Sequence, residues 1–163
     1  MIIKPNLQKP APKLELSAQP EGFYIIVDTR EQNPYFKSLD YAIVKKLSTG
    51  DYSIKGFEDQ ITIERKEVDD LLICIGKERK RFQRELERMR EFFWKGIVVE
   101  GKEIDLYTSV YSELSPLSIR WSLVSFRIKY GVHIYFAKDR ENGERWVHDH
   151  LYYYFTRKRE GKI

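Results

Sequence analysis

The sequence predicts an α/β fold, in which a mixed central β-sheet carries helices on both faces. Strand and helix patterns alternate from residue 23 onward, and the first strand pattern, residues 23–28, is continuously apolar until it ends in a charge. Such an apolar run is typical of a strand that is buried on both faces, and the alternation is typical of a layered α/β domain. At 163 residues and 19.6 kDa, the chain has the length of one domain with a full core.

The composition indicates an intracellular globular protein. Charged residues make up 33% of the chain and hydrophobic residues 42%, and no apolar run approaches the length of a membrane span. No signal-like apolar segment follows the N-terminus. The single cysteine, Cys74, lies in an apolar run and can form no internal disulfide. We therefore expect neither a membrane protein nor a secreted one.

The first half of the chain predicts a leader and four strands. Residues 1–20 hold four of the six prolines and predict an extended, poorly ordered leader, so the predicted domain covers residues 21–163. Strands are predicted over residues 23–28 and 41–47. After the Gly50-Asp51 bend, a short strand signal and the alternating run over residues 61–66 predict a hairpin, joined by a turn-prone segment.

The second half predicts helices and strands in turn. They are a helix over residues 70–94 with a break near Gly76, a strand over 97–100, a variable connection over 102–114, a helix over 116–130, a strand over 132–136 and a helix over 144–157. Ser115 suits the N-cap of its helix, Pro116 suits the first helical position, and Gly131 suits the left-handed C-terminus. A turn at Glu141-Asn142-Gly143 is expected before the last helix.

Two carboxylates and an amine converge at the predicted hairpin. Side chains alternate along a strand, so Glu64 and Lys66 share one face while Arg65 lies on the other, and strand pairing brings Asp51 close to Glu64. Two close carboxylates favour a hard divalent cation, Mg²⁺ or Mn²⁺, and a nearby lysine suits phosphodiester hydrolysis. The alternative is an ordinary solvated strand face, because Glu and Lys at i, i+2 are common on strands.

Further candidates lie next to this hairpin. Asp28 is a possible additional metal carboxylate, and Arg30 is a candidate phosphate contact; the alternative for Arg30 is an ion pair with a neighbouring acid. Asp69 and Asp70 suit an N-cap and a first-turn acid of the following helix, where the helix dipole favours negative charge.

A basic stripe is predicted on the helix after Gly76. Residues 77–90 hold seven basic and three acidic residues, so this segment accounts for the whole net charge of +4. An apolar stripe for the core recurs at i, i+4, i+7 and i+11: Phe82, Leu86, Met89 and Phe93. A basic stripe with the same spacing lies about 140° away: Lys77, Arg81, Arg84 and Arg88. Because the second stripe carries only positive charge, contact with a nucleic-acid backbone is favoured over a solvated helix face.

The order and spacing of these residues resemble a known signature. Gly50-Asp51, then Glu64-Arg65-Lys66, then Asp70 resembles the GD...ERKxxxD signature of the XPF-type family of structure-specific endonucleases. This family is a branch of the PD-(D/E)xK superfamily, which has a restriction-endonuclease-like fold. The segment at residues 27–31 resembles the DxRE strand end of the family, and Arg81-Phe82 with Glu85-Leu86 resembles its basic helix.

The resemblance implies a metal-dependent endodeoxyribonuclease that cuts branched DNA, such as 3′ flaps or forks. Asp51, Glu64 and the backbone carbonyl of Arg65 would bind Mg²⁺ or Mn²⁺, and Lys66 would position the attacking water. The Arg65 side chain would orient the site or a phosphate, and Asp70 would support the site. The alternative is a non-catalytic DNA-binding subunit or scaffold, because such families include partners that have lost the acidic motif. We expect no tandem helix-hairpin-helix module in this length of chain.

The last helix predicts a homodimer interface. Its core stripe at i, i+4 and i+7 is Val147, Leu151 and Tyr154. Further aromatic residues spread apolar surface around the helix: Trp146, Tyr153 and Phe155. A helix that is apolar on most sides must be covered, and an isologous contact with a second copy would cover it, as in related nucleases. The alternative cover is a partner domain.

Overall fold

A computed structural model describes residues 15–163 of the chain, and all of its strands belong to one mixed sheet. The sheet order is β2-β1-β3-β4-β5-β6, with β1 (Ile25–Val27), β2 (Ala42–Val44), β3 (Tyr52–Ile54), β4 (Ile61–Glu67), β5 (Trp94–Glu100) and β6 (His133–Phe136). Strand β4 pairs antiparallel with β3 and parallel with β5. The predicted leader lies, through residue 14, outside the described residues.

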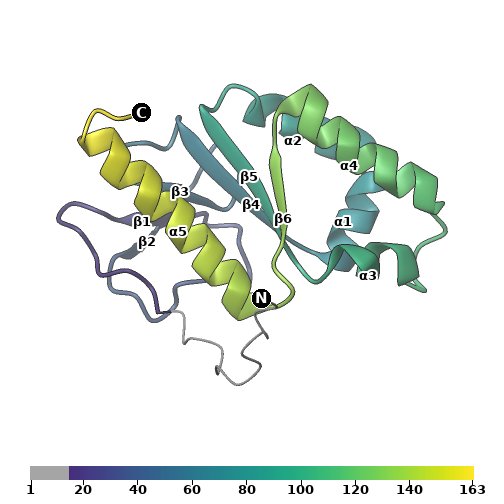
Figure 1. The fold of residues 1–163 in the computed structure, drawn as a ribbon, viewed down its shortest axis with the longest axis horizontal. Coiled ribbons are helices and arrows are strands. Elements are labelled where there is room, and N and C mark those ends of the chain that lie inside the picture. Colours follow the sequence, from purple (N-terminus) through teal and green to yellow (C-terminus); the bar gives the residue numbers. More distant parts are fainter. Residues whose placement is uncertain (1–14) are drawn as a thin grey trace, which may run out of the picture.

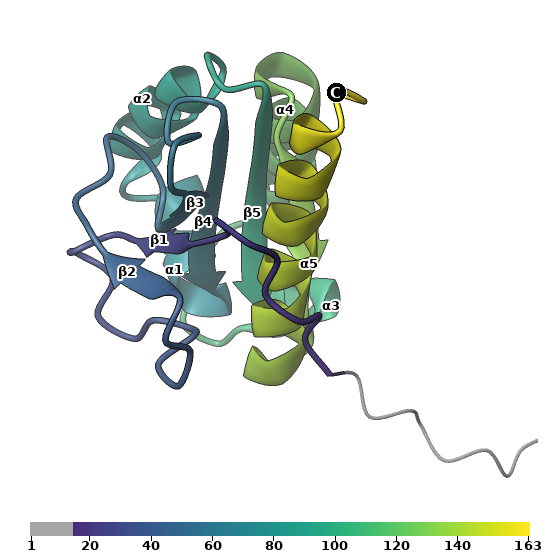
Figure 2. The ribbon, with the colours of Figure 1, turned by 90° about the vertical axis from the view of Figure 1, so that its left-hand side faces the viewer.

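Helices cover both faces of this sheet (Figures 1 and 2). They are α1 (Val68–Ile75), α2 (Arg79–Met89), α3 (Glu103–Thr108), α4 (Pro116–Tyr130) and α5 (Arg140–Arg159). One hydrophobic core packs α5 against β1, β3 and β4. A second core packs the four helices α1, α2, α3 and α4 against the other face of β5. The α/β prediction is therefore confirmed. Within residues 15–163, no helix combines the length and the apolar character that a membrane crossing requires.

The predicted elements form, with local signals acting as expected. Ser115 caps α4 by accepting a hydrogen bond from Ser118 N at 3.2 Å, Pro116 opens the helix, and Gly131 ends it at φ 66°. The predicted long helix does break near Gly76, where it divides into α1 and α2. Helix α2 ends at Met89 rather than near residue 94, because Trp94 already belongs to β5.

Two predictions in the second half were wrong. Gly143 does not form a turn but lies inside α5, which begins at Arg140 because the Asp139 side chain accepts a hydrogen bond from Asn142 N at 2.9 Å. A Cβ at position 143 would lie 2.3 Å from Tyr35 Oη, so the glycine allows close packing. The connection over residues 102–114 also contains a helix, α3.

The apolar residues of α5 are only partly exposed. The predicted core stripe of Val147, Leu151 and Tyr154 is buried as expected. Phe155 is buried too, with its ring 5.3 Å from that of Phe23, so the expectation that it adds surface was wrong. The fold bends the N-terminal segment over this side of α5, and sequence periodicity does not reveal that contact. Tyr153 remains exposed.

Candidate active site

Asp51 is aimed by a strained bend at the start of β3. Gly50 has φ +80°, and a Cβ on it would lie 2.1 Å from Thr62 Oγ1, so only glycine fits without a shift of the strand. The Asp51 N–H donates to Ile63 O at 2.8 Å, and its carboxylate accepts a 2.8 Å hydrogen bond from Arg65 N–H. The Asp51 side chain thus extends the hydrogen bonding between β3 and β4 beyond the first residue of β3.

Glu64 and Lys66 lie on the same face of β4, as strand alternation predicts. The Lys66 ammonium forms an ion pair with the Glu64 carboxylate, and Nζ lies 5.5 Å from the centre of the Phe82 ring of α2. Glu64 is only 6% exposed. Burial would lower the pKa of Lys66, but the charge of Glu64 outweighs it and raises that pKa above its ordinary value.

Both carboxylates resist ionisation in this setting. Burial raises the pKa of Asp51 to about 7, although the Arg65 N–H opposes the shift. Burial also raises the pKa of Glu64, and the negative charge of Asp51 adds to this effect. Two crowded carboxylates with one ammonium leave negative charge that a hard cation would stabilise. The residues therefore fit Mg²⁺ or Mn²⁺, which commonly keep several waters beside one or two carboxylates.

This donor set is small. Within residues 15–163, no group of three or more Asp, Glu, His or Cys side chains lies close enough to hold a metal by itself. A cation here would need a main-chain oxygen and water to complete its coordination.

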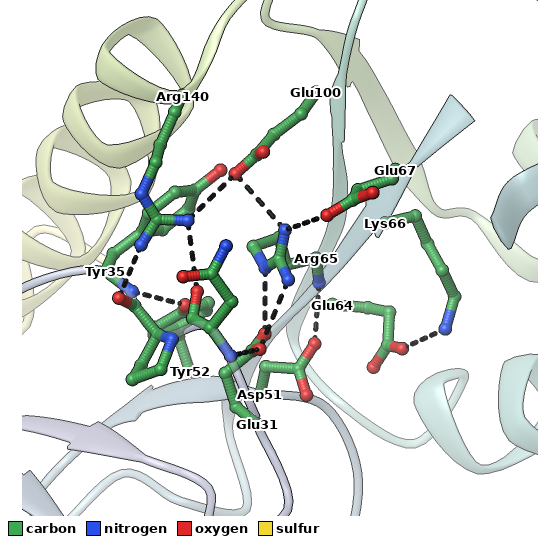
Figure 3. Close-up of polar contacts among 12 residues, drawn as sticks. Glu31, Tyr35, Asp51, Tyr52, Glu64, Arg65, Lys66, Glu67, Glu100 and Arg140 are labelled. Atoms are coloured by element: carbon green, nitrogen blue, oxygen red, sulfur yellow. Dashed lines mark hydrogen bonds and ion pairs between the residues drawn. The ribbon is translucent and has the colours of Figure 1, made fainter. Parts of the chain in front are cut away.

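Arg65 points its side chain to the opposite face of β4 (Figure 3). Its guanidinium contacts Glu31, Glu67 and Glu100, and the Arg65 side chain is 9% exposed. Burial would lower the pKa of this guanidinium, but the carboxylates around it raise the pKa above its ordinary value. The side chain therefore lies away from the face that carries Glu64 and Lys66, while the main chain of Arg65 stays beside Asp51.

Asp28 and Arg30 lie together at the end of β1. The Asp28 carboxylate accepts hydrogen bonds from Arg30 N at 2.9 Å, Arg30 Nε at 2.6 Å and Leu47 N at 2.6 Å. Burial would raise the pKa of Asp28, but these hydrogen bonds lower it. The ion-pair alternative for Arg30 is thus confirmed. Its side chain is still 61% exposed and remains accessible to a phosphate.

Asp70 is exposed, unlike half-buried Asp51 and buried Glu64. It is exposed in the first turn of α1, together with Asp69. Among residues 15–163, the Asp70 side chain makes no hydrogen bond or ion pair, whereas Asp69 accepts one from Ser109 Oγ at 3.2 Å. The N-cap residue is Glu67, without a side-chain cap bond, so the N-cap expectation was wrong and the first-turn expectation holds.

The predicted stripe residues of α2 are exposed, and one of them reaches the Asp51 bend. Arg88 Nε donates to Thr49 Oγ1 at 3.3 Å. Arg81 and Arg84 are exposed on the same helix, and Arg81 pairs with Glu78 at 3.4 Å. Lys77 is also exposed but precedes α2, so it does not belong to the helical stripe as predicted.

The apolar stripe of α2 ends at Met89 and does not include the predicted Phe93. Phe82, Leu86 and Met89 are buried as expected. Phe93, by contrast, is 65% exposed, and Phe92 is buried in its place. The helix ends at Met89, so the helical spacing no longer applies to the residues that follow.

Residues that the sequence analysis gave no role also lie at the site. Glu31 and Glu100 surround Arg65, and Arg140 contacts Glu100. Glu85 of α2 adds negative potential at Asp51, Glu64 and Lys66. A charge that closes a buried strand, as Glu100 does after residues 97–99, was the available signal for one of them. Glu31 and Glu85 fall within the two further segments that resemble the XPF-type family, whereas Arg140 carries no comparable signal.

A known family profile matches most of the chain. The sequence profile of the ERCC4 domain matches residues 27–150, which include Asp28, Asp51, Glu64 and Lys66. Among curated protein sequences, a search found no match.

Solved structures agree with the fold. The chain is similar to XPF from Aeropyrum pernix in complex with DNA, with 22% identity and a TM-score of 0.66 over 83% of this chain and 66% of that chain. Another structure of XPF from Aeropyrum pernix gives 24% identity and a TM-score of 0.66, over 82% and 62%. The chain thus spans about two thirds of the length of those XPF chains. At these identities the likeness shows a shared fold, and the profile match over most of the sequence shows that the chain belongs to the ERCC4 domain family.

Proposed function

We propose that the chain is a metal-dependent endonuclease that hydrolyses phosphodiester bonds in DNA. The observation that carries this proposal is the carboxylate pair of half-buried Asp51 and buried Glu64, whose pKa values desolvation raises, beside the ammonium of Lys66. Such a pair is costly without a cation and useful with one. Membership of the ERCC4 domain family supports the same reaction class.

The main chain of Arg65 supplies the third oxygen of the proposed metal site. In an extended strand, the N–H and C=O of one residue point to the same side. Arg65 N–H points to Asp51, so its carbonyl leaves β4 on the Asp51 side as well. Asp51, Glu64 and this carbonyl would hold Mg²⁺ or Mn²⁺. When bound, such an ion activates a water molecule and stabilises charge on the phosphoryl oxygens.

The remaining polar residues have distinct proposed tasks. Lys66 keeps Glu64 in place through its ion pair and positions the attacking water. Arg30, held by Asp28, would contact a phosphate with its exposed guanidinium. Asp28 has its oxygens engaged by Arg30 and Leu47, so we assign it to holding this strand end rather than to the metal. Asp70 keeps only a supporting role at the site.

The proposed substrate is branched DNA, such as a 3′ flap or a fork. Lys77, Arg81, Arg84 and Arg88 would contact the phosphate backbone, and Arg88 would link this contact to the Asp51 bend through Thr49. A solved structure of the similar XPF from Aeropyrum pernix is a complex with DNA, which supports DNA as the partner. The preference for branches rests on the resemblance to XPF-type nucleases.

Cleavage assays test the proposal against its alternative. Labelled flap, fork and linear duplex DNA would be incubated with the protein and Mg²⁺. We expect metal-dependent cutting that Asp51→Asn abolishes and that Asp59→Asn, an exposed acid in the β3–β4 turn, leaves unchanged. Binding without cutting would instead favour a non-catalytic DNA-binding subunit or scaffold. The intact pair of acids with Lys66 favours the enzyme.

We also propose that the protein acts as a homodimer through its C-terminal region. A cavity of about 430 Å³ lies beside α5 and is lined mainly by apolar side chains, among them Phe93, Trp94, Tyr153 and Ile163. Phe93 and Tyr153 are 65% and 58% exposed. An isologous contact would place the same side chains of a second copy against this surface.

A further inference from the structure

The guanidinium of Arg65 forms a buried two-point ion pair with the Glu31 carboxylate. Arg65 Nε lies 2.9 Å from Glu31 Oε2, and Arg65 Nη2 lies 3.2 Å from Glu31 Oε1. The two side chains are 9% and 6% exposed. A two-point contact of this kind fixes both the position and the plane of the guanidinium. Removing the Arg65 charge would leave the Glu31 carboxylate buried without its ion-pair partner.

A second carboxylate, that of Glu100, links this ion pair to the C-terminal helix α5. Glu100 Oε1 lies 3.3 Å from Arg65 Nη1 and 3.5 Å from Arg140 Nη1. Glu100 closes β5, and Arg140 opens α5. Arg140 also donates to Asn33 O at 3.1 Å and to Pro34 O at 2.5 Å, which ties down the loop after Glu31. We call Glu31, Arg65, Glu100 and Arg140 the arginine clamp (Figure 3).

An aromatic layer supports the arginine clamp. The Tyr35 ring lies 4.8 Å from the guanidinium carbon of Arg140 and 6.0 Å from that of Arg65. It stacks on the Tyr52 ring of β3, with the ring centres 5.4 Å apart and the planes at 16°. Tyr35 is buried, so the clamp rests on a packed layer rather than on mobile surface side chains.

The clamp acts where β4 keeps its pairing with β5 but has lost its strand partner on the β3 side. Strand β3 pairs with β4 at Tyr52 and Ile63, and β3 begins at Tyr52. Past Ile63, the β3 side of β4 is bonded to the Asp51 carboxylate through Arg65 N–H. The main-chain segment that carries Glu64 and Lys66 therefore runs beyond its antiparallel partner, and the clamp holds it from the opposite face.

We infer that Glu31 and Glu100 are positioning residues of the proposed nuclease site. By holding the Arg65 guanidinium, they fix the Arg65 peptide, whose N–H aims Asp51 and whose carbonyl is the proposed third metal oxygen. The inference rests on the proposed function. The inference predicts that the ion pairs of Arg65 with Glu31 and Glu100, on one face of β4, raise the metal affinity of the site on the other face.

Metal binding by substituted proteins tests the inference. Isothermal titration with MnCl₂ alone would compare wild type with Glu31→Gln, which keeps the shape of the side chain and removes its charge. Substituting a partner that orients a metal ligand typically weakens metal affinity by about 10–100-fold, and we expect a loss in that range. DNA affinity measured in Ca²⁺ should stay within about twofold of wild type, so that the loss appears in kcat rather than in KM.

Matched controls separate positioning from general stability. Glu58→Gln removes the ion pair with Lys45 (2.9 Å) at the far end of the hairpin, and we expect unchanged Mn²⁺ affinity. Lowered thermal stability of Glu31→Gln with wild-type Mn²⁺ affinity would overturn the inference. If Glu31→Gln does not fold, Glu100→Gln decides by the same comparison.

The test also separates this inference from the proposed function. A wild-type protein that neither binds Mn²⁺ nor cuts DNA would refute the proposed function. A wild-type protein that does both, with Mn²⁺ affinity that Glu31→Gln and Glu100→Gln leave unchanged, would refute only the positioning role.

Discussion

Arg65 donates its main-chain N–H to the Asp51 carboxylate at 2.8 Å while its guanidinium is buried on the other face of β4. One residue thus serves both faces of the sheet. On one face its peptide completes the setting of the Asp51 and Glu64 carboxylates, and on the other its side chain joins β4 to β5 and α5 through Glu31, Glu100 and Arg140.

Removing the Asp51 carboxylate should stabilise the metal-free protein. Its pKa is about 7 in the folded chain against an ordinary 3.8, so the folded state binds more protons between these values. Stability therefore falls as pH rises from about 4 to about 7, by about 1.4 kcal/mol per pKa unit at most. We expect Asp51→Asn to flatten this fall and to melt at a higher temperature than wild type at pH 8 in EDTA.

The same melting experiment carries its own control. Mg²⁺ should raise the melting temperature of wild type at pH 8 more than that of Asp51→Asn, because a ligand that binds only the folded state stabilises it. Asp59→Asn should behave as wild type in both respects. A metal-free Asp51→Asn protein that is less stable than wild type at pH 8 would contradict the assignment of Asp51 as a carboxylate whose charge destabilises the fold when no cation is bound.

Gly50→Ala should disrupt the bend that aims Asp51. The backbone there has φ +80°, and the new Cβ would lie 2.1 Å from Thr62 Oγ1. The strained backbone alone costs about 1–3 kcal/mol. Gly56→Ala is the matched control, because its φ is +88° and no atom lies within 4 Å of its Cβ. We expect Gly50→Ala to lose more unfolding free energy in urea than Gly56→Ala and to lose DNA cleavage, whereas equal losses would argue against the close contact.

Reversing charge on α2 should weaken DNA binding. Arg81→Glu with Arg84→Glu removes two exposed positive charges from the proposed phosphate contact. We expect lower affinity for every DNA substrate and a salt dependence whose slope falls by about one per lost contact. Fluorescence anisotropy over a range of NaCl concentrations measures both quantities. The control Lys37→Glu with Lys55→Glu, which reverses exposed charges elsewhere, should keep the wild-type slope; an equal slope in both double variants would remove α2 from the DNA contact.

The proposed dimer depends on Phe93 and Tyr153. Light scattering at micromolar concentration should give twice the monomer mass for wild type, and Phe93→Glu or Tyr153→Glu should reduce it to the monomer value of 19.6 kDa. Val110→Glu changes an apolar side chain that is 87% exposed elsewhere and should leave the mass doubled. Phe155 is unsuitable for this test because it is buried in the core of the subunit. A wild-type monomer at all concentrations would refute the homodimer.

Local signals determined much of this fold before any tertiary contact was known. The period of two along β4 places Glu64 and Lys66 on one face and Arg65 on the other, because this alternation is a property of the extended backbone itself. Ser115, Pro116 and Gly131 fix the ends of α4 for the same reason, since each acts through its own backbone or a neighbour three residues away.

Tertiary structure alone decided which distant groups meet. Glu31 finds Arg65 across 34 positions, and Glu100 finds Arg140 across 40. Gly143 was predicted to turn the chain, but the fold places Tyr35 against it and makes the missing Cβ a packing requirement. Residue spacing encodes which face a side chain occupies, whereas the identity of its partner depends on how strands and helices far apart in the sequence pack together.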